Sequence, residues 1–265
     1  MEILSYPFMR HALLVGLVLG ILFPLLGIFV VTKGMSFFSD FIAHAAILGS
    51  AIAVLMGTEP LVFLIPYSIA IGVSASVIWN RFPLSRDAVL GSLYGGVVAG
   101  GLALISIKGL SQTYLLRFLL GDILLIEPID IWLSLVLLLS YIVFLRLALR
   151  GLMKATLLPD IAEAEGIRVR LYDYALICFI ASAVALCIKI SGAILASAMI
   201  VIPASSAKVI SRSFKQFITL APIFGMASFI GGIYVAYYIN IPSGPSVVGV
   251  SFGLFLISLI ARKFR

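Results

Sequence analysis

The sequence predicts an all-α integral membrane protein, a polytopic bundle of about nine transmembrane helices, on three observations. Hydrophobic residues make up 63% of its 265 positions, and charged residues make up only 11%. Soluble domains contain about 45 to 50% apolar and about 25% charged residues, so a soluble fold could not bury this much apolar surface. The apolar residues also form long runs without a long polar insert, which predicts a single transmembrane domain over residues 1–265.

The length of each apolar run gives the expected helices in the first half of the chain. Crossing about 30 Å of hydrocarbon at about 1.5 Å per residue takes about 20 residues. Four runs meet this requirement, at residues 12–32, 41–58, 60–80 and 88–107. A fifth run, residues 131–145, is shorter, but Arg146 and Arg150 can lengthen it by keeping their charges among the headgroups. Residues 117–128 are apolar but too short to cross, so we expect an interfacial or re-entrant segment there.

The second half of the chain predicts four further crossings. Two apolar runs come first, at residues 174–188 and 190–207. Lys189 and a break at Ser191-Gly192 separate these two runs. Residues 216–261 are too long for one crossing. Pro242, Gly244 and Pro245 divide them into two, because two prolines and a glycine so close together cannot continue a helix.

Basic residues between the apolar runs give the expected orientation. With alternating crossings, 14 of the 18 basic residues fall on the same side as residues 151–173, and the remaining four are Arg10, Lys108, Arg117 and Lys189. Cytoplasmic loops of membrane proteins carry the excess of Lys and Arg. We therefore expect a multi-pass protein of the cytoplasmic (inner) membrane, embedded in the lipid bilayer, with the N-terminus outside and the C-terminus in the cytoplasm. This placement accounts for the net charge of +7 without a nucleic-acid partner.

The fourth apolar run contains two pairs of glycines at four-residue spacing, Gly91 with Gly95 and Gly96 with Gly100. Small residues at this spacing let a second helix approach the backbone closely. The pattern favours close packing within one subunit. The alternative is a helix that lines a transport path or a dimer interface.

One carboxylate and one imidazole share a helix face in the second apolar run. His44 follows Asp40 by four residues, and positions i and i+4 lie on the same side of a helix. Both groups can ligate zinc or manganese, and ionisable groups inside a membrane usually mark a transport path. Two ligands form an incomplete site, which suits an ion that must leave as well as bind. The alternative is structural: Ser39 or Asp40 caps the helix, and His44 bonds to nearby backbone.

The longest polar stretch between crossings, residues 156–173, predicts a short surface helix. Pro159 or Asp160 would begin this helix, Glu163 would lie within it, and Gly166 would end it. A short capped helix in a cytoplasmic loop offers a docking surface for another protein. A solvated connector is the alternative.

Motifs of the common enzyme classes are missing from the sequence. It contains no glycine-rich Walker motif, no Gly-x-Ser-x-Gly elbow and no His-Glu-x-x-His pair. We therefore expect that the chain is not an enzyme. Transport against a gradient would then need a separate ATPase or an ion gradient.

A series of short motifs runs along nearly the whole chain in a fixed order. They lie at residues 27–31, 33–36, 39–40 with 43–46 and 49, 87–91, 120–124, 159–160, 192–195, 202–204 and 242–246. In this order the sequence resembles the permease subunits of the bacterial zinc, manganese and iron ABC importer family (ABC-3 type). One departure is visible: many relatives have proline-glycine soon after the histidine, where this chain has Ile47-Leu48-Gly49.

The resemblance implies a function, a set of partners and a fold. The chain would be the permease of an ATP-binding-cassette importer of divalent metal ions, with Asp40 and His44 in the metal path. Zinc, manganese or iron would be the transported substrate, and no cofactor would be permanently bound. The expected partners are a cytoplasmic ATPase that docks at the loop of residues 156–173, an extracytoplasmic metal-binding protein that delivers the ion, and a second permease copy. The fold would be similar to that of vitamin B12-type ABC importer permeases.

Two other functions remain as alternatives. The first is a permease for a siderophore or cobalamin complex, but such subunits are usually longer, and a wide path has little use for a carboxylate and an imidazole at ligand spacing. The second is an intramembrane metal-dependent enzyme. It lacks further ligands, since His11 is the only other histidine.

Overall fold

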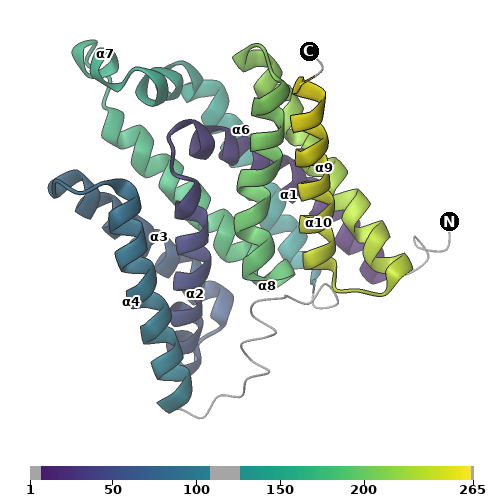
Figure 1. Cartoon of the computed structure of the whole chain (residues 1–265). Helices are drawn as coiled ribbons and strands as arrows, with labels where there is room; N and C mark the ends of the chain where they lie inside the picture. Colours follow the sequence, from purple (N-terminus) through teal and green to yellow (C-terminus); the bar gives the residue numbers. More distant parts are fainter. Residues whose placement is uncertain (1–6, 108–125, 264–265) are drawn as a thin grey trace.

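The computed structural model describes residues 7–107 and 126–263, and every regular element in them is helical. The all-α fold is confirmed. Within these residues nine helical segments are long and apolar enough to cross a membrane. They are α1 (Pro7–Thr32), α2 (Ser36–Met56), α3 (Pro60–Arg81), α4 (Arg86–Ile107), α6 (Pro128–Leu157), two halves of α8 (Val169–Ile210), α9 (Phe214–Ile239) and α10 (Ser243–Lys263). A short helix, α7 (Pro159–Ala164), lies between α6 and α8 (Figure 1).

The fifth expected crossing, residues 131–145, forms only part of the first two thirds of α6 (Pro128–Leu157). This helix has 30 residues, a length of about 45 Å, which exceeds the hydrocarbon thickness. At its start Glu127 and Asp130 form a capping box, in which the side chain of each residue accepts a hydrogen bond from the backbone N–H of the other residue. Arg146 and Arg150 are exposed on the helix surface and do not interrupt it. Most of the interfacial segment expected at residues 117–128 lies outside the described residues.

The chain reverses direction inside α8 at the expected break. Gly192 has φ 83° and ψ 168°, a conformation that is nearly restricted to glycine. Both ends of α8 contact the end of α1: Asp173 pairs with Lys33, and Lys208 donates to the carbonyl of Val31. The two halves of α8 therefore form two candidate crossings that meet at Gly192.

The expected cytoplasmic loops share one end of the molecule. The guanidinium of Arg86, at the start of α4, lies 3.5 Å from the carbonyl oxygen of Lys33 between α1 and α2. Lys33 in turn contacts α6 and α8 on either side of α7. Figure 1 shows α7 and the C-terminus at this same end. The positive-inside rule predicts that this end faces the cytoplasm, because it carries most of the basic residues.

Thiol labelling measures this orientation. In a background without Cys178 and Cys187, we expect single cysteines at Thr58 and Ser243 to react with an impermeant reagent in intact cells. A cysteine at Glu163 should react only after the cells are permeabilised. Labelling of position 163 in intact cells would show that the orientation is opposite to the expected one.

Glycines allow the central helices to cross at close range. α1 packs against α8, α9 and α6, and α8 packs against α2, α3 and α10. A methyl group at Gly27 of α1 would overlap the carbonyl oxygen of Ile200 in α8. A methyl group at Gly225 of α9 would overlap the carbonyl oxygen of Gly20 in α1. Close backbone contact of this kind is a main source of helix association in membranes, where burial of apolar surface between helices adds little.

We therefore expect Gly27→Ala to be strongly destabilising. The overlap involves backbone atoms that cannot rotate away, and the free energy of unfolding should fall by about 3 kcal/mol or more. The measurement is the thermal midpoint of the detergent-purified protein. Gly253→Ala is the matched control, because no heavy atom lies within 4 Å of its added methyl group. Equal midpoints for the two variants would contradict the close crossing of α1 and α8.

Candidate metal path and coupling loop

The helix that carries Asp40 and His44 begins before either residue can cap it. α2 starts at Ser36, and Met35 occupies the N-cap position without a side-chain cap hydrogen bond. The hydroxyl of Ser39 donates to the carbonyl of Ser36, at 3.2 Å. Asp40 lies one turn inside the helix. The alternative in which Ser39 or Asp40 caps this helix is therefore wrong.

One ring nitrogen of His44 bonds to the backbone, and the other has no hydrogen-bond partner among the described residues. Its Nδ1 lies 3.0 Å from the carbonyl oxygen of Asp40 and 3.6 Å from the carboxylate oxygen Oδ1. A carbonyl oxygen only accepts, so Nδ1 donates and carries the ring proton. The lone pair of Nε2 is then available to a metal ion, and the backbone bond orients the ring as outer partners do at many metal sites. The side chains of His44 and Asp40 are 21% and 32% exposed, so both can be reached.

An aromatic ring borders His44, and a second ring contacts the first; sequence reasoning predicted neither contact. The ring of Tyr94, on α4, lies with its centroid 4.9 Å from that of His44, and the ring of Phe37 lies 5.8 Å from Tyr94. Tyr94 comes from the glycine-rich run, 50 residues after His44 in the sequence. The position of Tyr94 beside His44 depends on how α4 packs against α2, and the spacing of residues along the sequence does not predict this packing.

α2 continues without a break through the segment that departs from the family pattern. Residues 47–49 are helical, and α2 ends only at Met56. A methyl group at Gly49 would meet the ring of Tyr67 on α3, and one at Gly101 of α4 would lie 3.2 Å from the backbone nitrogen of Leu48. Glycines thus hold α3 and α4 close to α2 on two sides.

The glycine pairs of α4 do not all pack inside the subunit. A methyl group at Gly91, Gly95 or Gly96 would meet no heavy atom within 4 Å, and all three residues are exposed. Only Gly100 approaches a neighbour, the side chain of Leu48. Within the described residues, the packing interpretation is therefore wrong for three of the four glycines, whose face of α4 is exposed in the single chain.

Within the described residues, one chain supplies two donors at this position, Asp40 and His44. Among the residues that the structure describes, no group of three or more His, Cys, Asp and Glu side chains could hold a metal ion. Asp40 and His44 could fill two of the four positions around a tetrahedral zinc ion.

The short helix expected in the polar loop is present. α7 begins at Pro159 and carries Asp160 and Glu163 on its exposed surface. Gly166, at φ 81°, ends it, and the N–H of Ile167 donates to the carbonyl of Ala162 at 2.9 Å. The connector is shorter than the expected loop of residues 156–173, because α6 and α8 both extend into it.

The surface around α7 carries exposed apolar side chains as well as charged ones. Four large apolar side chains around α7 are each more than half exposed: Leu157, Leu158, Ile161 and Leu171. Exposed apolar side chains that cluster beside charged ones often mark a protein interface. The buried Ala162 holds α7 in place beneath them, against Ala155 of α6 and Val169 of α8.

Nine apolar helical segments long enough to cross a membrane, in the part of the chain that the structure describes, are typical of a membrane transport permease. The comparisons agree with this class. The chain belongs to the ABC 3 transport family, whose model matches residues 5–262. It is a permease subunit of the metal ABC transporters.

Curated relatives cover nearly the whole chain. The high-affinity zinc uptake system membrane protein ZnuB of Haemophilus influenzae is 28% identical, over 95% of this chain and 97% of its own. The manganese transport system membrane protein MntC of Listeria monocytogenes is also 28% identical, over 97% and 92%. A probable metal transport system membrane protein of Thermotoga maritima is 29% identical, over 96% and 90%.

Solved structures have the same fold. PsaBC from Streptococcus pneumoniae, solved with a Fab, superimposes with a TM-score of 0.84 at 26% identity, covering 97% of this chain and 92% of that one. An ABC transporter described as metal-chelate type, in an inward-facing conformation, gives a TM-score of 0.76 at 17% identity, covering 96% and 86%. The expected all-α permease fold is confirmed: the structural neighbours are ABC transporter permeases.

Proposed function

We propose that this chain is the permease of an importer that carries zinc or manganese into the cytoplasm, with Asp40 and His44 as transient ligands. The observation that carries the proposal is the geometry of this pair: two partly exposed donors on one face of α2, with Nε2 of His44 free. The carboxylate offsets part of the charge of a divalent cation, and the imidazole suits a borderline metal ion. Zinc and manganese relatives of equal identity support both ions as substrates.

A second copy of the chain would complete the ligand set. Two donors per copy give four donors when two copies face each other. The exposed glycines of α4 support this arrangement, since Gly91 and Gly95 flank Tyr94 and leave room for another helix. The metal would then be bound weakly enough to leave, because each copy can withdraw its two ligands.

ATP hydrolysis would take place in a separate cytoplasmic subunit that docks at α7. The four exposed apolar side chains around α7 support this docking surface, and Asp160 and Glu163 would add charged contacts at its edge. An extracytoplasmic metal-binding protein would deliver the ion at the opposite end of the bundle.

Uptake by the complete transporter tests the proposed function. The permease is reconstituted in vesicles with its ATPase and delivery protein, and the accumulation of radioactive zinc and manganese is followed with and without ATP. We expect ATP-dependent accumulation of one or both ions in the direction of delivery. Accumulation of only siderophore-bound iron or cobalamin, or export of the metal, would overturn the proposal.

A further inference from the structure

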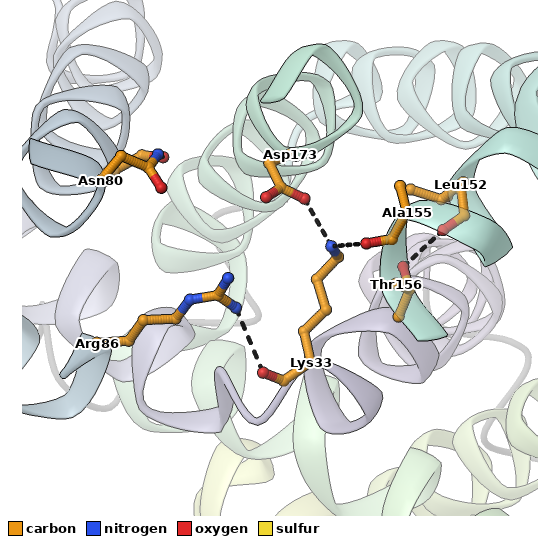
Figure 2. A network of polar contacts seen from close by, with 8 residues as sticks. Lys33, Asn80, Arg86, Leu152, Ala155, Thr156 and Asp173 are labelled. Atoms are coloured by element: carbon orange, nitrogen blue, oxygen red, sulfur yellow. Dashed lines mark hydrogen bonds and ion pairs between the residues drawn. The ribbon is translucent and has the colours of Figure 1, made fainter. Parts of the chain in front are cut away.

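One lysine is buried at the end of the molecule that carries α7. Lys33 directly follows α1, and its side chain is only 4% exposed. Its Nζ donates to Oδ1 of Asp173 at 2.6 Å and to the carbonyl oxygen of Ala155 at 3.2 Å (Figure 2). Asp173 is itself 14% exposed. An ammonium group buried this far needs such partners, so the two bonds fix the position of the lysine.

The two partners of Lys33 belong to the structure that holds α7. Ala155 lies in the last turns of α6, and Asp173 lies in the first turns of α8. Ala155 also packs against Ala162 of α7 and Val169 of α8 in a small buried cluster. A displacement of α7 therefore acts on both partners of Lys33.

A rigid corner connects Lys33 to the helix that carries the ligand pair. Gly34 has φ 65°, the N–H of Lys33 donates to the carbonyl of Phe29, and the N–H of Met35 donates to that of Val30, both at 2.9 Å. This is the Schellman arrangement of a helix end, and the side chain of Met35 is buried beneath it. α2 begins one residue later, so a displacement of Lys33 passes directly to the start of α2.

The same corner also contacts the helix that carries Tyr94. The carbonyl oxygen of Lys33 lies 3.5 Å from Nη1 of Arg86, at the start of α4 (Figure 2). The guanidinium of Arg86 is held over the ring of Trp79, 5.8 Å from its centroid. The helix that carries the ligand pair, α2, and the helix that borders it, α4, thus both begin beside Lys33.

We propose that Lys33 is a positioning residue that transmits the movement of α7 to α2, and so couples ATP hydrolysis to the ligand pair of Asp40 and His44. The inference rests on the proposed function and deepens it. Stability alone is a weak reason for such a pair, because apolar residues of similar volume stabilise a protein as well as a buried ion pair does. The pair does provide a directional connection between two elements that lie 140 residues apart in the sequence.

Coupling is measured as the metal ions taken up per ATP hydrolysed by the complete transporter. In Lys33→Met the stem remains but the charge is lost, and we expect this ratio to fall at least about fivefold while the ATPase still assembles and hydrolyses ATP. Lys33→Arg keeps the charge and should retain most of the ratio. Lys154→Met is the matched control, because it removes the ion pair between Lys154 and Glu165 at the same end of the molecule. The side chains of this pair are 49% and 45% exposed, and the pair joins neither α1 nor α2.

A purely structural role predicts different results. If Lys33→Met reduces assembly, the double variant Lys33→Met/Asp173→Leu removes both buried charges and should restore assembly without restoring the ratio. A wild-type ratio in Lys33→Met or in the double variant would overturn the role of Lys33. An equal loss of the ratio in Lys154→Met would also overturn it. These outcomes are read against a wild-type complex that transports metal; absence of transport by the wild type would instead count against the proposed function.

Discussion

Replacement of Asp40 by Asn should lower metal uptake at least about tenfold, because loss of a ligand costs at least as much as loss of the outer partners of a metal site. The variant keeps the size of the side chain and removes only the charge that offsets a divalent cation. The effect is expected to be chemical, because the Asp40 side chain is not used as a helix cap. His44→Ala should have an effect of similar size, since it removes the free Nε2. The measurement is uptake of radioactive zinc or manganese, normalised to assembled transporter.

Glu59→Gln is the control for the loss of one negative charge. Glu59 is exposed between α2 and α3 and makes no side-chain cap hydrogen bond. Uptake by this variant should equal that of the wild type. Normal uptake by both Asp40→Asn and His44→Ala would remove the pair from the metal path and leave His44 with a structural role only.

Disruption of α7 should uncouple the permease from its ATPase. Ala164→Pro removes a backbone donor from a six-residue helix, and Ile161→Glu places a charge in the exposed apolar surface around it. We expect the amount of ATPase that co-purifies with the permease to fall at least about tenfold, which corresponds to about 1.4 kcal/mol of binding free energy. Charge reversal at Glu163 should produce a smaller loss, because an exposed charge at the rim contributes less.

Two comparisons separate loss of docking from loss of folding. Ile161→Val keeps the apolar contact surface and should retain the ATPase. Binding of zinc or manganese to the isolated permease should survive in all α7 variants, because α7 does not contact Asp40 or His44. Normal assembly and transport by Ala164→Pro and Ile161→Glu would make the loop a connector.

The sequence alone predicted the number of crossings and most breaks between them. Hydrocarbon thickness fixes the length of an apolar run, and glycine or proline at Gly192 and Pro242 cannot continue a regular helix. Helix ends were less accurate, and α6 is the clearest case. Its capping box at Glu127 and its exposed Arg146 allow the helix to run well beyond the hydrocarbon, where hydropathy no longer marks it.

The candidate site divides in the same way. The proximity of Asp40 and His44 was predictable, because residues at i and i+4 lie on one face of any helix. The short helix that starts at Pro159 was predictable from its proline. Tyr94 was not, since its contact with His44 exists only where α4 packs against α2. The bond between Lys33 and Asp173 likewise depends on the reversal of α8 at Gly192 and on the glycine crossings that bring α1 and α8 together. Local sequence thus indicated which residues are candidates for chemistry, while long-range packing decided which of them meet, because contacts between distant helices follow from the shape of whole surfaces.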